Sequence, residues 1–157
     1  MLALLRDTAG GGVLRHTTPE GLAREVACGE LEGAWGLWVD DVDGDGRREV
    51  LIALRKRARH DPRVENRLHV HSLEQGRCVP VWRGTRLAGR FDDLAVELDA
   101  PGTLLALERG GEGRRIARYR WSDFGYALES ELWRGDGTPP PSLRDRFVHV
   151  QNIEGDP

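Results

Sequence analysis

The chain has 157 residues, enough for one domain with a hydrophobic core of its own. Its 23 basic and 26 acidic residues are spread along the whole length and leave a net charge of −3. This balance gives no electrostatic reason to expect nucleic acid or an anionic membrane as partner. No apolar stretch approaches the roughly 20 residues that a membrane span needs, so we expect no membrane span.

Short apolar blocks, bounded by Gly, Pro and Asp, predict β-strands along the whole chain. The blocks are rich in Val, Leu, Ile, Trp and Tyr, and no part of the chain carries a convincing helical stripe. We therefore predict an all-β fold. In chain order, the predicted strands are 2–7, 12–18, 22–31, 35–42, 49–57, 67–74, 79–85, 91–98, 103–109, 115–121, 127–134 and 146–153.

An internal repeat is the strongest signal in the sequence. A leucine followed by an aromatic ring recurs at equal intervals, as Leu31–Trp35, Leu87–Phe91 and Leu143–Phe147. Three further segments agree downstream: 49–55 with 102–108, 67–71 with 115–119, and 81–84 with 132–135. Because these matches keep the same order, we infer that one unit is present several times.

The third copy of the unit is divided between the two ends of the chain. Residues 150–157 resemble 39–46, and residues 1–5 resemble 51–55, the strand that should come next. The chain therefore holds about three repeats that are circularly permuted relative to its termini. We expect one domain, 1–157, with repeats at about 31–86, 87–142, and 143–157 plus 1–30.

Four strands in a repeat of about 50 residues are typical of the blades of a β-propeller. Because blades stack on one another, a strand can be covered on both faces. Such a strand need not alternate apolar and polar residues, as in residues 50–54. Three blades are too few to close a ring, so we predict a head-to-tail homodimer with six blades and no free edges. The alternatives are a fragment of a longer chain and an open arrangement of three sheets.

An acidic loop joins the first two strands of the first repeat. Calcium takes six to eight oxygen ligands, and alternate aspartates in a tight loop point toward one centre. Gly46 permits the sharp turn, and an EF-hand is not expected because the place of its last carboxylate is Ile52, inside a strand. The alternative is a solvated turn kept by turn chemistry alone. The predicted Ca²⁺ ligands are the carboxylates of Asp41, Asp43, Asp45 and Glu49 and the backbone carbonyl of Arg47.

With an aromatic residue before it and Glu49–Ile52 after it, this loop resembles the FG-GAP/VCBS repeats of integrin-type propellers. The resemblance covers the chain as repeat architecture, and residues 35–55 match the motif itself. It implies adhesion, ligand display or scaffolding, a protein or carbohydrate ligand, an ion in the aspartate-rich loop and a location outside the cytoplasm. Met1–Leu5 is too short for a signal-peptide core. The second repeat keeps only Asp99 in its loop, so we expect one ion site per chain.

Two pairs of residues with metal or redox chemistry have simpler interpretations. Cys28 and Cys78 share no repeat position and no metal-binding spacing, so buried thiols are favoured over a disulfide. His69 and His71 share one face of a strand and could begin a metal site, but no third ligand is evident. The favoured interpretation of the histidines is a strand face half-covered by the next blade.

Acidic and aromatic residues offer further candidates. Asp92 and Asp93 lie on a predicted inner strand, where they would line an axial channel. Trp82 and Trp133 are predicted to pack between blades. For Trp38 and Trp121, a stacking platform for sugars is the lesser option.

The sequence contains no nucleophile elbow, phosphate-binding loop or dinucleotide fingerprint. It therefore favours a non-catalytic, calcium-stabilised β-propeller that acts as a binding or scaffold module. The alternative is an enzyme, a hydrolase or lyase acting on a polymer, because a fold alone does not determine function. Its site would lie at the mouth of the propeller, near the predicted long loops 57–66 and 135–142.

Overall fold

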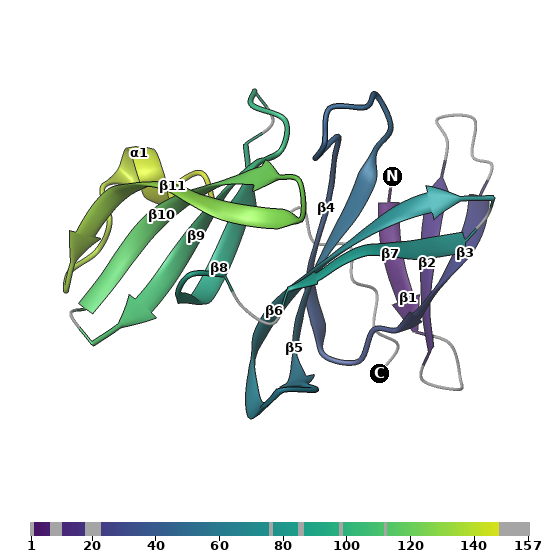
Figure 1. Cartoon of the computed structure of the whole chain (residues 1–157), viewed down its shortest axis with the longest axis horizontal. Helices are drawn as coiled ribbons and strands as arrows, with labels where there is room; N and C mark the ends of the chain where they lie inside the picture. The colour runs from purple at the N-terminus through teal and green to yellow at the C-terminus, as the bar shows by residue number, and fades with distance from the viewer. Residues whose placement is uncertain are drawn as a thin grey trace.

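The computed structural model describes residues 2–6, 11–17, 23–75, 77–84, 87–97, 99–111 and 113–147. Within these residues the chain is all-β, as predicted, with a single short helix (Figure 1). The elements are β1 (Leu2–Arg6), β2 (Gly11–Thr17), β3 (Ala23–Glu30), β4 (Ala34–Asp40), β5 (Glu49–Ala58), β6 (Asp61–Glu74), β7 (Arg77–Gly84), β8 (Arg90–Val96), β9 (Thr103–Gly110), β10 (Gly113–Ser122), β11 (Gly125–Gly135) and α1 (Pro141–Arg144). This helix is far too short to cross a membrane, and the described residues contain no other.

The strands form two sheets, which lie beside each other in Figure 1. Strands β8 to β11 form a four-stranded antiparallel meander. The longer sheet contains a second four-stranded meander, β4 to β7, and a three-stranded meander, β1 to β3. These two parts join where β3 runs parallel to β7 at one residue pair, Ala27 and Arg77.

The central strands β5 and β9 take the same place in their meanders, second from the end of each. The prediction that segments 50–54 and 104–107 are equivalent strands is therefore confirmed. Ala53 pairs with Leu68, and its counterpart Ala106 pairs with Ala117. The third strands are thus shifted by one residue from the predicted alignment, because the turns of the two hairpins set different registers.

Three predictions at the ends of strands need correction or fall outside the structure. Residues 57–66 are not a long loop, because β5 continues to Ala58 and pairs with the start of β6 at Asp61. The polar residues there lie on an exposed two-stranded ribbon, which resembles a loop in composition. The predicted loop 135–142 leads into α1, where Pro141 occupies the first turn. Of the predicted strand 146–153, Arg146 and Phe147 are not in a strand, and the rest lies outside the described residues.

One hydrophobic cluster joins the two sheets. Its buried strand residues include Leu51, Ala53, Leu68 and Val70 from β5 and β6, and Leu104, Ala106, Ala117 and Tyr119 from β9 and β10. Trp82 packs edge-on against Trp121 and Tyr126 of the other sheet, with ring centroids 6.2 and 5.9 Å away. The predicted packing of Trp82 between units is confirmed. Trp38 packs against Trp35 in the same cluster, so neither Trp38 nor Trp121 forms an open platform.

The outward faces of the two sheets are also covered. The longer sheet is curled, and Leu14 of β2 and Cys28 of β3 pack against Val50 and Ile52 of β5. On the shorter sheet, Leu105 and Ile116 are covered by Trp133 together with Leu143 and Phe147. Burial on both faces explains why β5 and β9 lack strict alternation of apolar and polar residues.

Candidate metal centre

The acidic loop 41–48 is shaped by its own carboxylates and glycines. Asp43 Oδ1 accepts a hydrogen bond from the Asp45 amide at 3.2 Å, and Asp45 Oδ1 accepts one from the Arg47 amide at 2.7 Å. Asp41 Oδ2 accepts a hydrogen bond from the Gly46 amide at 3.0 Å. The φ angle of Gly46 is +85°, in the left-handed region, which agrees with the predicted reason for glycine at this place.

Three of the predicted ligand residues come together. Asp41, Asp43 and Glu49 each place one carboxylate oxygen within 4.8 Å of the others. Asp41 Oδ1 is buried and has no hydrogen-bond partner within the described residues. A buried acceptor without a donor is unfavourable, and a cation would satisfy it. These three carboxylates are the strongest candidate for a metal centre in the described part of the chain.

The Asp45 carboxylate does not join this group. The Asp45 carboxylate turns to its own loop, where Oδ1 holds the Arg47 amide and Oδ2 lies 3.9 Å from Arg47 Nε. The Arg47 side chain is 80% exposed and points to solvent. Three of the four predicted carboxylates therefore converge in this structure, and the backbone carbonyl of Arg47 stays a predicted ligand.

Glu49 is the buried member of the cluster, with 4% of its surface exposed. Its Oε2 accepts a hydrogen bond from the Val42 amide at 3.0 Å, which pins the start of the loop to the start of β5. Burial raises the pKa of Glu49, and the negative charges of Asp43, Asp45 and Asp41 raise it further. A bound cation would relieve this repulsion.

The loop is not an EF-hand. It connects two paired strands, β4 and β5, and the place of the last EF-hand ligand is Ile52, which is fully buried in β5. A cavity of about 520 Å³ adjoins the cluster, and its lining includes Asp43, Glu49, and Ser72 and Glu74 of β6. An ion could therefore reach the cluster from solvent.

The acidic loop also contacts the other sheet. Asp40, at the end of β4, is 8% exposed, and its Oδ2 accepts a hydrogen bond from the Gly102 amide at 2.8 Å. Gly102 has a φ of +71°, and a Cβ atom there would lie 2.4 Å from the Val42 carbonyl oxygen. The turn between β8 and β9 therefore packs directly on the backbone of the acidic loop.

The structure corrects the interpretation of the two cysteines. Cys28 and Cys78 form a disulfide, with their Cα atoms 4.7 Å apart. The parallel pairing of β3 and β7 brings these residues together, and this pairing cannot be read from their spacing in sequence. The disulfide covalently joins the β1–β3 unit to the rest of the longer sheet.

The remaining predicted residues have ordinary surroundings for a β-sheet protein. Asp92 is paired with Arg109 at 2.7 Å, and Asp93 Oδ1 accepts a hydrogen bond from the Leu94 amide at 2.9 Å. The rings of His69 and His71 lie 6.0 Å apart, but no third ligand joins them among the described residues. The two histidines therefore form no second metal centre in that part of the chain.

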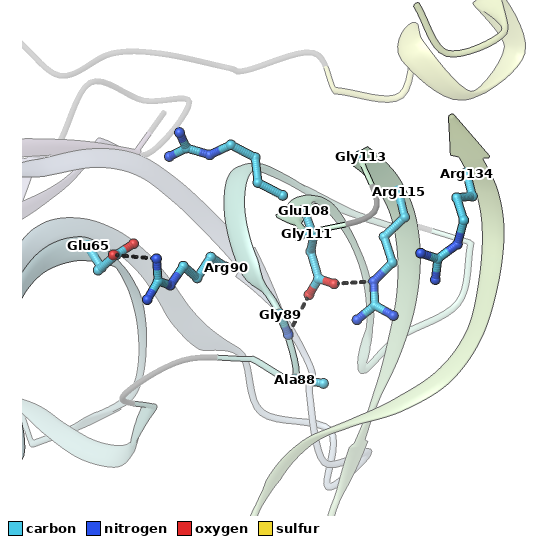
Figure 2. Close-up of a pocket in the computed structure, with 11 residues that line it drawn as sticks. Glu65, Ala88, Gly89, Arg90, Glu108, Gly111, Gly113, Arg115 and Arg134 are labelled. Carbon is cyan, nitrogen blue, oxygen red and sulfur yellow. Dashed lines mark hydrogen bonds and ion pairs between the residues drawn. The ribbon is translucent and has the colours of Figure 1, made fainter. Parts of the chain in front are cut away.

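The shorter sheet contains a buried polar network that we did not predict from the sequence (Figure 2). Glu108 is 1% exposed and accepts hydrogen bonds from the Tyr119 hydroxyl, from Arg115 Nε at 2.7 Å and from the Gly89 amide at 3.1 Å. Burial and then the bond to Glu108 raise the pKa of Tyr119, and the same carboxylate raises the pKa of Arg115. Glu108 and Arg115 pair across β9 and β10, so the hairpin register could have identified them.

This network lies beside a cavity of about 750 Å³, whose other charged walls include Arg90 and Arg134. Figure 2 shows Arg134 beside Arg115, and Arg90 turned toward Glu65, 3.5 Å away. Arg134 is itself held by Glu131 at 2.6 Å. Because the carboxylate of Glu108 is occupied by three donors, the network stabilises the sheet and presents no free acid or base.

No protein-family model, curated protein or solved structure matches this chain. The resemblance of residues 35–55 to FG-GAP/VCBS repeats stays a prediction from the sequence.

Proposed function

We propose that this chain is a non-catalytic binding or scaffold module of the β-propeller type, stabilised by one Ca²⁺ in the loop between β4 and β5. The observation that carries the proposal is the convergence of Asp41, Asp43 and Glu49 within 4.8 Å. Hard carboxylate oxygens suit calcium, and loop carbonyls and water would complete its shell. The unpartnered Oδ1 of Asp41 supports the same conclusion.

The position of the loop explains what an ion would contribute. The loop is anchored at its start by Glu49, which accepts from Val42, and against the other sheet by Asp40, which accepts from Gly102. An ion that orders the loop would therefore stiffen the contact between the two sheets. The role proposed for calcium is structural support of a surface used for binding.

Thermal unfolding with calcium and with chelator tests the ion site. Calcium at about 100 times its Kd stabilises a protein by about 2.7 kcal/mol, which corresponds to a rise of about 5–10 °C in Tm for a domain of this size. We expect this rise for calcium and a smaller one for magnesium, which prefers a tighter octahedral site. An identical Tm in calcium and in chelator would remove the ion from the proposal.

Variants of single carboxylates show where the ion binds. Asp43→Asn and Glu49→Gln should abolish the calcium-dependent rise, while Asp45→Asn should keep most of it because Asp45 is outside the cluster. Asp99→Asn is the matched control, since this exposed carboxylate lies in the corresponding turn of the second repeat. Equal loss in all four variants would indicate a general charge effect instead of a site.

The propeller architecture is also a proposal, supported by two four-stranded meanders that share one hydrophobic cluster. The β1–β3 unit supplies three strands of a third blade, and two chains joined head to tail would give six blades. Size exclusion with light scattering tests the assembly. We expect a dimer, and a monomer at micromolar concentration would contradict the six-bladed ring.

A further inference from the structure

A second cavity, of about 590 Å³, lies between the end of β3, the β5–β6 ribbon and the outward face of β6 and β7. Its walls include four basic side chains, Lys56, Arg57, Arg59 and Arg83. None of the described residues that line it carries a carboxylate. A volume of this size is within the range of small-molecule sites in proteins, about 300–1,000 Å³.

These basic side chains differ from the paired arginines of the chain. Most arginines described in the structure are paired with a carboxylate, such as Arg109 with Asp92 and Arg118 with Glu97. Lys56, Arg57, Arg59 and Arg83 form no ion pair with any residue in the described part of the chain. The cavity thus concentrates positive charge that the described residues do not neutralise.

Arg67 also lines the cavity, but its positive charge is neutralised by an ion pair. It is 1% exposed, and its guanidinium is bound by Asp61 Oδ2 at 2.9 Å and by the carbonyl oxygens of Arg63 and Lys56 at 3.1 and 3.4 Å. Arg67 therefore serves to hold the β5–β6 ribbon in place over the cavity, while the other basic side chains stay available.

Two histidines form the inner wall. His71 is 3% exposed, and its Nδ1 is buried with no hydrogen-bond partner among the described residues. The ring of His69 lies 6.0 Å from it, and His69 pairs across the sheet with Arg83. When Nδ1 of His71 carries the ring proton, it lacks an acceptor, and an anion in the cavity would provide one.

We propose that this cavity binds a small molecule carrying a phosphate or sulfate group, held by Lys56 and Arg83 and by hydrogen bonds from His69 and His71. Phosphate and sulfate oxygens accept charge-assisted hydrogen bonds, which arginine forms in pairs. The basic residues Arg57 and Arg59 at the end of the ribbon would attract the anion to the cavity. This site is independent of the calcium loop and of the proposed propeller assembly.

Binding of an anion would change the charge of the histidines. In the empty cavity, burial lowers the pKa of both rings to about 4, and the neighbouring charges of Lys56 and Arg83 add to the effect at His69. An anion offsets these charges and raises the pKa of both rings. The other charged or titratable residues that line the cavity are Lys56, Arg57, Arg59, His60, Arg83 and Arg67, which is paired with Asp61. Cys28, which also lines it, is in a disulfide and does not titrate. For sulfate, whose own charge is constant over this range, affinity should therefore increase as the pH falls from 7 to 5.

The test is calorimetric titration of the full chain with inorganic phosphate at constant ionic strength. Chloride, added as the sodium salt, is the comparison anion. We expect saturable binding of phosphate, weakened at least tenfold by the double change Lys56→Gln and Arg83→Gln. Arg77→Gln is the matched control, because Arg77 is an exposed arginine on the same strand that does not line the cavity. Equal weakening by Arg77→Gln, or no saturable heat with phosphate, overturns the proposal.

Two further measurements separate the ligand sources and the role of the rings. Tighter binding of glucose 6-phosphate than of phosphate would indicate an organic ester, and equal or weaker binding would indicate the free oxyanion; glucose alone should not bind. Histidine NMR should show the pKa of His69 and His71 rising from about 4 when phosphate is added. Unchanged histidine titrations at saturating phosphate would contradict the proposed binding mode.

Discussion

Asp40 accepts a hydrogen bond from the backbone amide of Gly102, at 2.8 Å, and so connects the end of β4 to the turn between β8 and β9. The two residues belong to different sheets and to different predicted repeats. Because the Asp40 carboxylate is buried, water has little access to it, and the Gly102 amide satisfies it instead. It is a polar contact between units whose main attachment is hydrophobic.

We expect Asp40→Ala to lower the free energy of unfolding by about 1–3 kcal/mol, because the Gly102 amide loses its acceptor. Asp40→Asn keeps an acceptor oxygen and should cost less. Urea unfolding at pH 7 measures both variants. A larger loss in Asp40→Asn than in Asp40→Ala would show that the carboxylate does not act through this hydrogen bond.

The network around Glu108 provides a stronger test of buried polar contacts. Glu108→Ala removes the partner of Arg115 and Tyr119 at once, and breaking a buried pair typically costs about 3–5 kcal/mol. Glu25→Ala is the comparison, since the Glu25–Arg15 pair is exposed and exposed pairs contribute about 0–1 kcal/mol. Denaturant unfolding of both variants should show this contrast, and similar losses would argue against burial as the cause.

The disulfide between Cys28 and Cys78 should contribute substantially to stability. Closing a loop of 50 residues stabilises by about 4 kcal/mol in the chain-entropy estimate. We expect reductant to lower the Tm of the native chain and to leave the Tm of the double variant Cys28→Ser and Cys78→Ser unchanged. Titration of two free thiols in the untreated, folded protein would contradict the disulfide.

The half-buried His69 and the buried His71 should make the protein sensitive to mild acid. Burial lowers the pKa of His69 and His71 to about 4 from 6.5, so the unfolded chain binds protons that the folded chain does not. Their contribution to stability is therefore present above pH 6.5 and is lost as the pH falls toward 4. Unfolding by urea at pH 7, 6 and 5, in buffer without phosphate or sulfate, should show this decline.

The double variant His69→Gln and His71→Gln is the control for the pH effect. Its stability should change less between pH 7 and 5, because glutamine does not titrate. A slope as steep as that of the native chain would assign the acid sensitivity to other groups.

Most strands could be predicted because the type of their side chains reflects their burial in a sheet. Runs such as 50–54 and 103–107 are apolar, rich in branched side chains and bounded by turn residues, and both proved to be central strands. The ribbon 57–66 was missed for the opposite reason, since its polar residues face solvent on both sides. Pairing registers were less predictable because turns, and not side-chain types, set them.

The candidate sites also differ in how well the sequence could predict them. The cluster of Asp41, Asp43 and Glu49 was predictable because its members are close in sequence and alternate along one loop. The disulfide was not, because it depends on one parallel pairing of strands distant in sequence. The cavity lined by Lys56, Arg57, Arg59 and Arg83 was also missed. These residues come from β5, the turn after it and β7, and only the fold shows that they form no ion pair with a described residue.

Strand β5 is hydrogen-bonded on both sides and covered on both faces from Glu49 to Leu54. Its amides can meet solvent only when both hydrophobic clusters separate together. Deuterium uptake at β5 should therefore follow unfolding of the whole molecule. The β1–β3 unit, joined to β7 by one backbone pair and one covalent bond, should exchange by an earlier and separate opening.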